Sequence, residues 1–190
     1  MPRTADPHLQ DRILKAALTL LRERGQKGLT LRSVARAAGT TTTTVYKRFR
    51  NRDALVAELA DRAQQRLIAD LTSVQSVEEI YRRHLHFAEK NPREYQLLFS
   101  GMGTETFGGR GDRAVETWIL GQLAAQFGGK PEDYLDFHAV LFLATQGAAS
   151  LITFAPSHRA SAAVRERSIA VCDILVNHIE AFRQKPPAVE

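Results

Sequence analysis

The sequence has a single cysteine, Cys172, so a disulfide bond within the chain is impossible and the disulfide framework of a small secreted protein is excluded. Cys172 lies in an apolar helical pattern, which favours a buried and unreactive thiol. The opening segment, Met1 to Asp11, is polar and lacks the apolar stretch of a secretory signal peptide. These absences favour a protein of the cytoplasm.

Long hydrophobic runs are also scarce. One stretch, Phe137–Ser157, contains no Asp, Glu, Lys or Arg and approaches the length that spans a bilayer. However, it carries Thr145, Gln146 and Ser150, and no cluster of positive charge flanks it. These features favour a central helix that is buried on most sides, so we expect no membrane among the partners.

Motifs of catalysis are missing as well. The six histidines are scattered, and His84 and His86, two residues apart, point away from each other on a helix and make a poor metal pair. The sequence has no Gly-x-Ser-x-Gly, no His-Glu-x-x-His and no phosphate-binding P-loop. We therefore predict no catalytic residues, no metal and no cofactor, and we keep an enzyme only as an alternative to a binding protein.

Sustained alternation of apolar and polar residues, the pattern of half-buried strands, is absent, and helical spacing replaces it. Thr30, Asn51 and Ser76 are expected helix caps, and Gly25 and Gly39 are expected helix ends. The sequence therefore predicts an all-α fold of about nine helices. They are expected to cover about residues 7–24, 31–38, 42–49, 52–71, 77–90, 92–99, 112–127, 131–155 and 160–183.

Positive charge is concentrated in the first third of the chain. Residues 1–66 contain 14 Lys and Arg against 6 Asp and Glu, a net charge of +8, whereas residues 67–190 contain 12 against 15, a net charge of −3. A basic end on a slightly acidic body indicates a polyanionic partner for that end.

Within Thr30–Leu55, two short helices meet at a tight glycine turn, which is the layout of a helix-turn-helix. Ala35 and Ala38 are small enough for close helix packing, and Val45 and Phe49, four residues apart, are expected to face the core. Threonine offers a hydroxyl to base edges and a methyl group to thymine. The opposite face of the third helix carries residues suited to DNA: Thr42, Thr43, Tyr46 and Lys47.

This segment resembles the TetR family of bacterial regulators over about residues 7–60. The resemblance rests on Gly39, on Thr44-Val45-Tyr46-Lys47-Arg48-Phe49 and on Asn51-Arg52-Asp53-Ala54-Leu55. The family pattern has Ser, His and Lys where this chain has Thr41, Arg48 and Arg52, and each replacement keeps the hydrogen-bonding or charge role. By position, the resemblance implies that Thr41 caps the recognition helix and that Lys47 contacts either bases or phosphates. It implies base contacts for Arg32, Thr42, Thr43 and Thr44, and phosphate contacts for Tyr46, Arg48 and Arg52.

The resemblance further implies a helix-turn-helix DNA-binding domain at residues 1–55 and a helical ligand-binding and dimerisation domain at residues 56–190. The last two helices, Asp133–Ala155 and Ala160–Arg183, have wide apolar stripes that suit a four-helix interface between two copies. The expected protein is a homodimeric repressor that binds a near-palindromic operator in double-stranded DNA and responds to a small-molecule effector. A helical protein-interaction module without specific DNA binding is the alternative, and salt dependence would distinguish it.

For the effector, the body offers large or polar groups on apolar faces, which is the mixture that ligand sites use, although most of them also suit a plain core. The glycine-rich segment at residues 101–111 is either a gate or a surface loop. The candidate effector residues are Tyr81, His84, Phe87, Tyr95, Phe99, Met102, Trp118, Gln122, Phe142 and Gln146.

Overall fold

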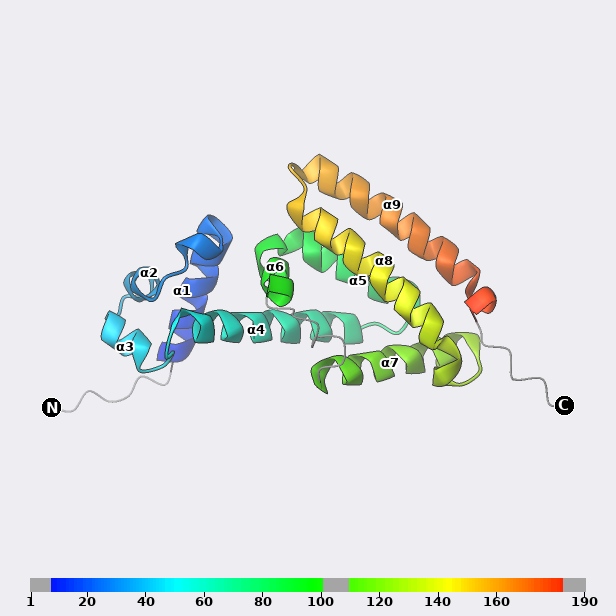
Figure 1. The fold of residues 1–190 in the computed structure, drawn as a ribbon, viewed down its shortest axis with the longest axis horizontal. Coiled ribbons are helices and arrows are strands. Elements are labelled where there is room, and N and C mark those ends of the chain that lie inside the picture. Colours follow the sequence, from blue (N-terminus) through cyan, green and yellow to red (C-terminus); the bar gives the residue numbers. More distant parts are fainter. Residues whose placement is uncertain (1–7, 101–109, 183–190) are drawn as a thin grey trace. The chain divides into compact units, whose positions relative to one another are not determined.

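Helices form every regular element in the residues that the structure describes (Figure 1). This computed structural model describes residues 8–100 and 110–182, without the side chains of residues 99–100 and 110–112. Within these ranges the fold is all-α, as the sequence predicts, with helices α1 to α9. The chain divides into two units, Met1–Gln64 and Gln65–Glu190.

The first unit has a small apolar core to which each of its α-helices contributes. The division between the units falls inside α4, later than the expected boundary at residues 55 and 56. The first part of α4 belongs to the first unit, where the Arg62 side chain donates a hydrogen bond to Asp11 of α1 at 2.9 Å. The elements are α1 (Leu9–Arg24), the 3-10 turn η1 (Gln26–Gly28), α2 (Leu31–Ala37), α3 (Thr42–Tyr46) and the first turns of α4 (Arg52–Thr72). The buried apolar residues are Ile13, Leu14, Ala17, Leu20, Leu21, Leu29, Leu31, Val34, Ala35, Val45, Phe49, Leu55, Leu59 and Ala63.

Local signals fix where these helices begin and turn. Thr30 is the N-cap of α2 and forms a capping box with Ser33, and the Asn51 side chain accepts a hydrogen bond from the Ala54 N–H at 2.8 Å. Gly39, between α2 and α3, has a φ of 62°, a left-handed conformation that is strained for residues with a Cβ. The turn between the two helices therefore depends on glycine at this position.

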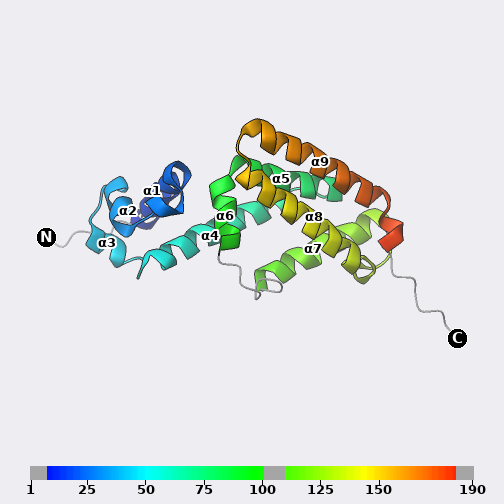
Figure 2. The same ribbon diagram turned by 45° about the horizontal axis from the view of Figure 1, so that its top comes forward.

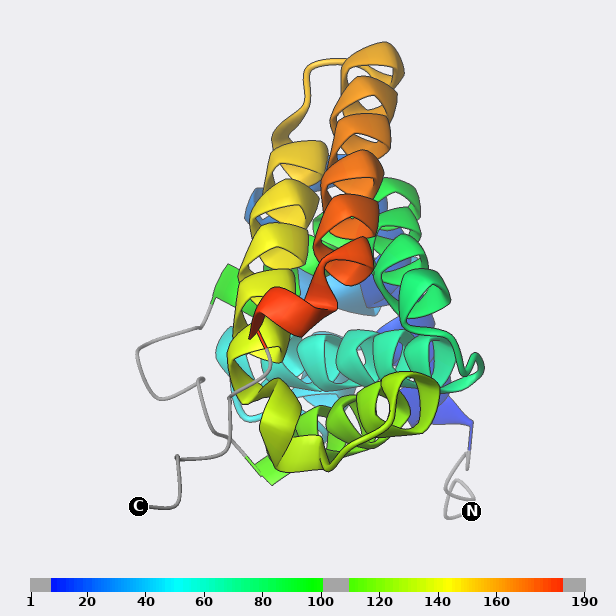
Figure 3. The ribbon, with the colours of Figure 1, turned by 90° about the vertical axis from the view of Figure 1, so that its right-hand side faces the viewer.

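The second unit packs three long helices side by side. These are α5 (Val77–Lys90), α8 (Leu135–Phe154) and α9 (His158–Asn177), with α8 and α9 antiparallel to each other (Figures 1 and 3). The helices α6 (Pro92–Ser100) and α7 (Arg110–Phe127) also contact this group (Figure 2). Two 3-10 turns complete it, η3 (Pro131–Tyr134) before α8 and η4 (Ile179–Phe182) after α9.

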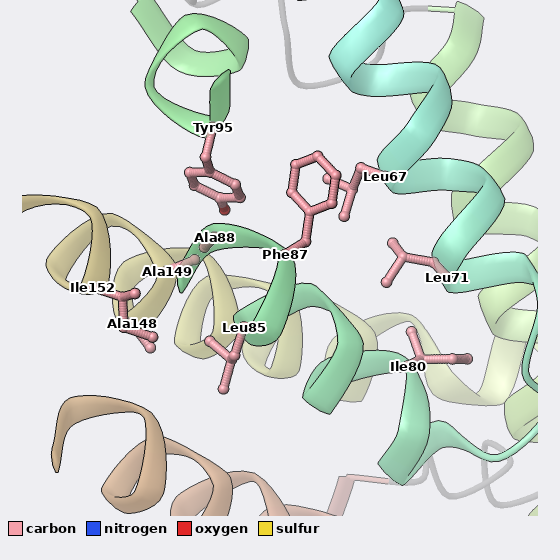
Figure 4. Packing of buried hydrophobic residues seen from close by; sticks show 10 residues of the cluster. All are labelled: Leu67, Leu71, Ile80, Leu85, Phe87, Ala88, Tyr95, Ala148, Ala149 and Ile152. Atoms are coloured by element: carbon pink, nitrogen blue, oxygen red, sulfur yellow. The ribbon is translucent and has the colours of Figure 1, made fainter. Parts of the chain in front are cut away.

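Two clusters of buried side chains hold the second unit together. The first joins the end of α4 to α5, α6 and α8 through Leu67, Leu71, Ile80, Leu85, Phe87, Ala88, Tyr95, Ala148, Ala149 and Ile152 (Figure 4). The second includes Val77, Tyr81, Leu120, Leu123, Tyr134, Phe137, Leu141, Cys172, Val176 and Ile179. Cys172 is buried, as its apolar pattern predicts.

Several helix boundaries differ from those that the spacing predicts, among them those of the third, seventh and last helices. The third helix ends at Tyr46, so Phe49 is buried in the following turn rather than in the helix. The last long helix ends at Asn177 and continues as η4, and α7 begins at Arg110. Residues 101–109 of the glycine-rich segment lie outside the described residues.

The helix α8 is less buried than its uncharged sequence suggests. Together with η3 it is long and apolar enough to cross a membrane by length and composition alone, and 33% of its apolar window is buried. Leu143, Leu151 and Phe154 are 59%, 64% and 76% exposed. The expectation of a helix buried on most sides therefore does not hold for the residues that the structure describes, because among them one side of α8 is not covered by another helix.

Candidate nucleic-acid interface

The recognition helix α3 has one buried face and one exposed face. Val45 and Phe49 are 0% and 5% exposed, so they anchor the helix and the turn after it to the core, as predicted. Tyr46, next to Val45, is 56% exposed, which is unusual for a large aromatic side chain. The surface on which sequence reasoning placed DNA is therefore open to solvent.

The four threonines at the start of α3 do not have equal freedom. Thr41 is the N-cap, and its hydroxyl accepts a hydrogen bond from the Thr44 N–H at 3.2 Å. The hydroxyls of Thr41 and Thr44 also bond each other at 2.8 Å. Thr43 is exposed and Thr42 is half-buried. Thr43 is thus the exposed threonine of the four that takes no part in capping, which makes it the most available for contact with a base edge.

Exposed cations surround α3 within the first unit. Arg32 of α2 and Lys47 and Arg48 after α3 are all exposed, consistent with the contacts implied for them. Two further exposed arginines, Arg36 and Arg50, were given no contact in the sequence prediction. Their charge is the signal that could have found them, because clustered basic residues are the usual electrostatic mark of a phosphate-binding surface.

Arg52 differs from the other predicted phosphate ligands. Its Nε donates to the Leu29 carbonyl at 2.9 Å, and a terminal nitrogen donates to the Gln26 carbonyl at 2.8 Å. The other terminal nitrogen is 3.7 Å from an oxygen of Asp53. The guanidinium is thus engaged with the backbone of the same unit.

In the second unit, three of the predicted effector residues form one buried polar chain. His84 Nε2 and the Tyr95 hydroxyl are 2.8 Å apart, and that hydroxyl donates to Gln146 Oε1 at 2.8 Å. Because the hydroxyl hydrogen is directed at Gln146, its oxygen accepts from Nε2–H, and neutral His84 carries its proton on Nε2. Burial lowers the pKa of His84 to about 4 and raises the pKa of the Tyr95 phenol.

The other predicted effector residues divide between the cluster that contains Tyr95 and other parts of the second unit. Tyr81 donates to Asp173 of α9, and burial raises the pKa of its phenol. Phe87 belongs to the first buried cluster and Trp118 packs against it, whereas Phe142 stacks on His138. Gln122 is half-buried, the side chain of Phe99 is not described, and Met102 lies outside the described residues.

Sequence reasoning missed a buried carboxylate beside the polar chain. Glu94, adjacent to Tyr95, is 2% exposed and forms an ion pair with Arg66 of α4. The guanidinium of Arg66 also lies 5.8 Å from the ring centre of Phe87. A glutamate in the first turn of a helix resembles ordinary N-terminal charge, so no local signal distinguishes this one.

Comparison with known proteins is decisive for the first unit. The sequence model of the family described as bacterial regulatory proteins, tetR family, matches residues 13–59, which include most of α1, all of α2 and α3, and the start of α4. Residues 13–59 therefore form a tetR-family domain. No curated protein matches its sequence.

Solved structures extend the similarity in fold to nearly the whole length of the chain. A protein of unknown function from Rhodococcus sp. RHA1 is 22% identical with a TM-score of 0.69, and the alignment covers 93% of this chain and 98% of that one. The TetR family regulator PfmR from Thermus thermophilus is 17% identical with a TM-score of 0.62, covering 88% and 98%. A bacterial regulatory protein in the tetR family from Rhodococcus RHA1 is 16% identical with a TM-score of 0.62, covering 90% and 97%. These similarities establish the fold of the body.

Together, the tetR-family domain and its helix-turn-helix identify this protein as a DNA-binding transcriptional regulator. The helices α8 and α9 add an exposed apolar surface, here called the α8–α9 face. It consists of Leu135, Val140, Leu143, Leu151, Phe154, Val171 and Ile174.

Proposed function

We propose that this protein is a repressor that binds a near-palindromic operator as a homodimer and releases it when a small molecule binds the body. The observation that carries the proposal is the exposed face of α3. Thr43 and Tyr46 are open to solvent there, while Val45 and Phe49 hold the segment rigidly from beneath. A short rigid segment with exposed hydroxyls and flanking cations suits entry into a major groove.

In this proposal the contacts divide into two classes. Threonine hydroxyl and methyl groups read base edges, with Thr43 the principal reader because it is exposed and has no capping role. Tyr46, Lys47 and Arg48 hold phosphates, which positions the helix and supplies affinity without sequence information. Such binding weakens steeply as salt rises, whereas an apolar protein interface would not.

The α8–α9 face supports dimerisation. Its side chains are 38% to 76% exposed, and so many exposed large apolar side chains on two helices that pack together favour an interaction site. Gly147 lies on the same side of α8, and a Cβ built there meets no atom within 4 Å. A glycine inside a helix lowers helix stability by about 1 kcal/mol relative to alanine. Close approach of a second helix at this position would explain why glycine is present there. We therefore assign this face to a second copy of the chain.

The effector would act on the second unit. The chain His84–Tyr95–Gln146 places hydrogen-bonding groups inside an apolar surround, as ligand sites do. An effector that favours one arrangement of the dimer would shift the population away from the form in which both recognition helices match successive grooves. The protein would act in the cytoplasm, where bacterial DNA lies.

Selection of bound sequences from random double-stranded DNA at near-physiological salt tests the proposal. We expect a near-palindrome with two half-sites about one helical turn apart, in line with a dimeric helix-turn-helix protein. Recovery of a single half-site would contradict the dimer. Recovery of no specific sequence by folded, dimeric protein would contradict the repressor model and support the interaction module.

Two variants of α3 separate base reading from phosphate binding. Tyr46→Ala is expected to weaken binding to all duplexes by a similar factor, whereas Thr43→Ala is expected to change which bases are preferred at one position of each half-site. Repeating the selection with each variant measures preference, and fluorescence anisotropy on specific and scrambled duplexes measures affinity. An unchanged preference profile for Thr43→Ala would show that Thr43 does not read bases.

A further inference from the structure

Arg52 joins two parts of the helix-turn-helix that lie far apart in the sequence. It is the first residue of α4, yet its guanidinium donates to the carbonyls of Gln26 and Leu29, at 2.8 and 2.9 Å. These carbonyls belong to η1 and the residue after it, in the segment that links α1 to α2. The bonds are charge-assisted and use the fork of the guanidinium in a way that a single ammonium group cannot reproduce.

The linked segment determines where α2 begins. Leu29 is fully buried and is followed directly by Thr30, the N-cap of α2. The helix α2 is in turn connected to α3 by the glycine turn at Gly39. Holding the carbonyls at 26 and 29 against the start of α4 therefore fixes α2, and through it α3, relative to α4.

We propose that Arg52 is a positioning residue for the recognition helix and not a phosphate ligand. Two of its three guanidinium nitrogens are engaged with backbone carbonyls, and the third lies 3.7 Å from a carboxylate oxygen of Asp53. Lys47 and Arg48, by contrast, are exposed cations immediately after α3. This inference rests on the proposed DNA-binding function, and it reassigns the role that the family resemblance implies for Arg52.

The test compares Arg52→Ala and Arg52→Lys with Lys47→Ala on the duplex recovered by selection. Affinity is measured by fluorescence anisotropy over a series of salt concentrations, and circular dichroism confirms that each variant is folded at the assay temperature. Both Arg52 variants are expected to bind roughly tenfold more weakly than wild type, because two charge-assisted bonds that orient the helix are lost or reduced. Their plots of log affinity against log salt should keep the wild-type slope.

Lys47→Ala provides the matched comparison, since loss of one phosphate contact reduces that slope by about 0.9. A similar reduction for Arg52→Ala, or wild-type affinity in Arg52→Lys, would identify Arg52 as a phosphate ligand and overturn the inference. Unchanged affinity with only a lower melting temperature would also overturn it, because Arg52 would then be merely structural. Failure of the wild type to bind any selected duplex would overturn the proposed function itself, and this inference with it.

Discussion

Leu143→Arg is expected to convert the protein into a monomer and to weaken operator binding by roughly 100-fold. Leu143 is 59% exposed in the single chain and lies on the α8–α9 face. In the proposed dimer the arginine would be buried without a partner, which is strongly unfavourable. Specific DNA complexes are typically about 10³ to 10⁷ times tighter than non-specific ones, and a monomer keeps only one of two half-sites.

Sedimentation equilibrium at micromolar concentration measures the first effect, and anisotropy on the selected duplex measures the second. Ala125→Arg is the matched control, because Ala125 is an exposed residue of α7 outside the α8–α9 face. We expect that variant to remain dimeric and to bind as the wild type does. A dimeric Leu143→Arg protein would remove the α8–α9 face as the interface.

Acidification is expected to destabilise the second unit through His84. The pKa of His84 is about 4 in the folded chain and 6.5 in an unfolded one, because burial disfavours the imidazolium. As pH falls, the unfolded state therefore binds a proton at a higher pH than the folded state does. The free energy of unfolding decreases as pH falls from 6.5 to about 4. A shift of this size corresponds to about 3 kcal/mol across that window.

Urea unfolding at pH 7 and near pH 4 measures this effect. His84→Gln retains a group able to bond the Tyr95 hydroxyl. Its free energy of unfolding should decrease between pH 7 and pH 4 by about 3 kcal/mol less than that of the wild type. His86→Gln is the control, since His86 is exposed on the same helix. An equal decrease in the free energy of unfolding of the wild type and of His84→Gln between the two pH values would contradict the prediction, whatever the absolute stability of the variant.

Local chemistry made the helix-turn-helix predictable. Cap residues act on neighbouring backbone groups, so Thr30 and Asn51 could be assigned before any tertiary contact was known, and the family resemblance supplied Thr41. Gly39 was recognised because only glycine adopts its φ of 62° at little cost. The exposed face of α3 followed from the spacing of Val45 and Phe49, although the helix proved too short to include Phe49.

Contacts between distant residues could not be predicted in the same way. Tyr95 bonds Gln146 across 51 positions, and Arg52 bonds Gln26 across 26, with no periodicity to reveal either pair. The family resemblance assigned Arg52 to phosphate, whereas its bonds to Gln26 and Leu29 support the positioning role proposed above, because a resemblance transfers a residue's role but not its neighbours. Glu94 was overlooked for a related reason, since its burial depends on how α4 and α6 pack.

By itself, the sequence determined the all-α fold and the basic charge of the first third of the chain, because periodicity, capping and charge are properties of neighbouring residues. The family of the N-terminal domain followed from the resemblance of its motif. The tertiary structure alone decided which polar groups are buried together and which apolar side of α8 is left exposed. An apolar helix can be covered by its own chain or by another, and only the packing of α5, α8 and α9 shows that Leu143, Leu151 and Phe154 remain uncovered in the single chain.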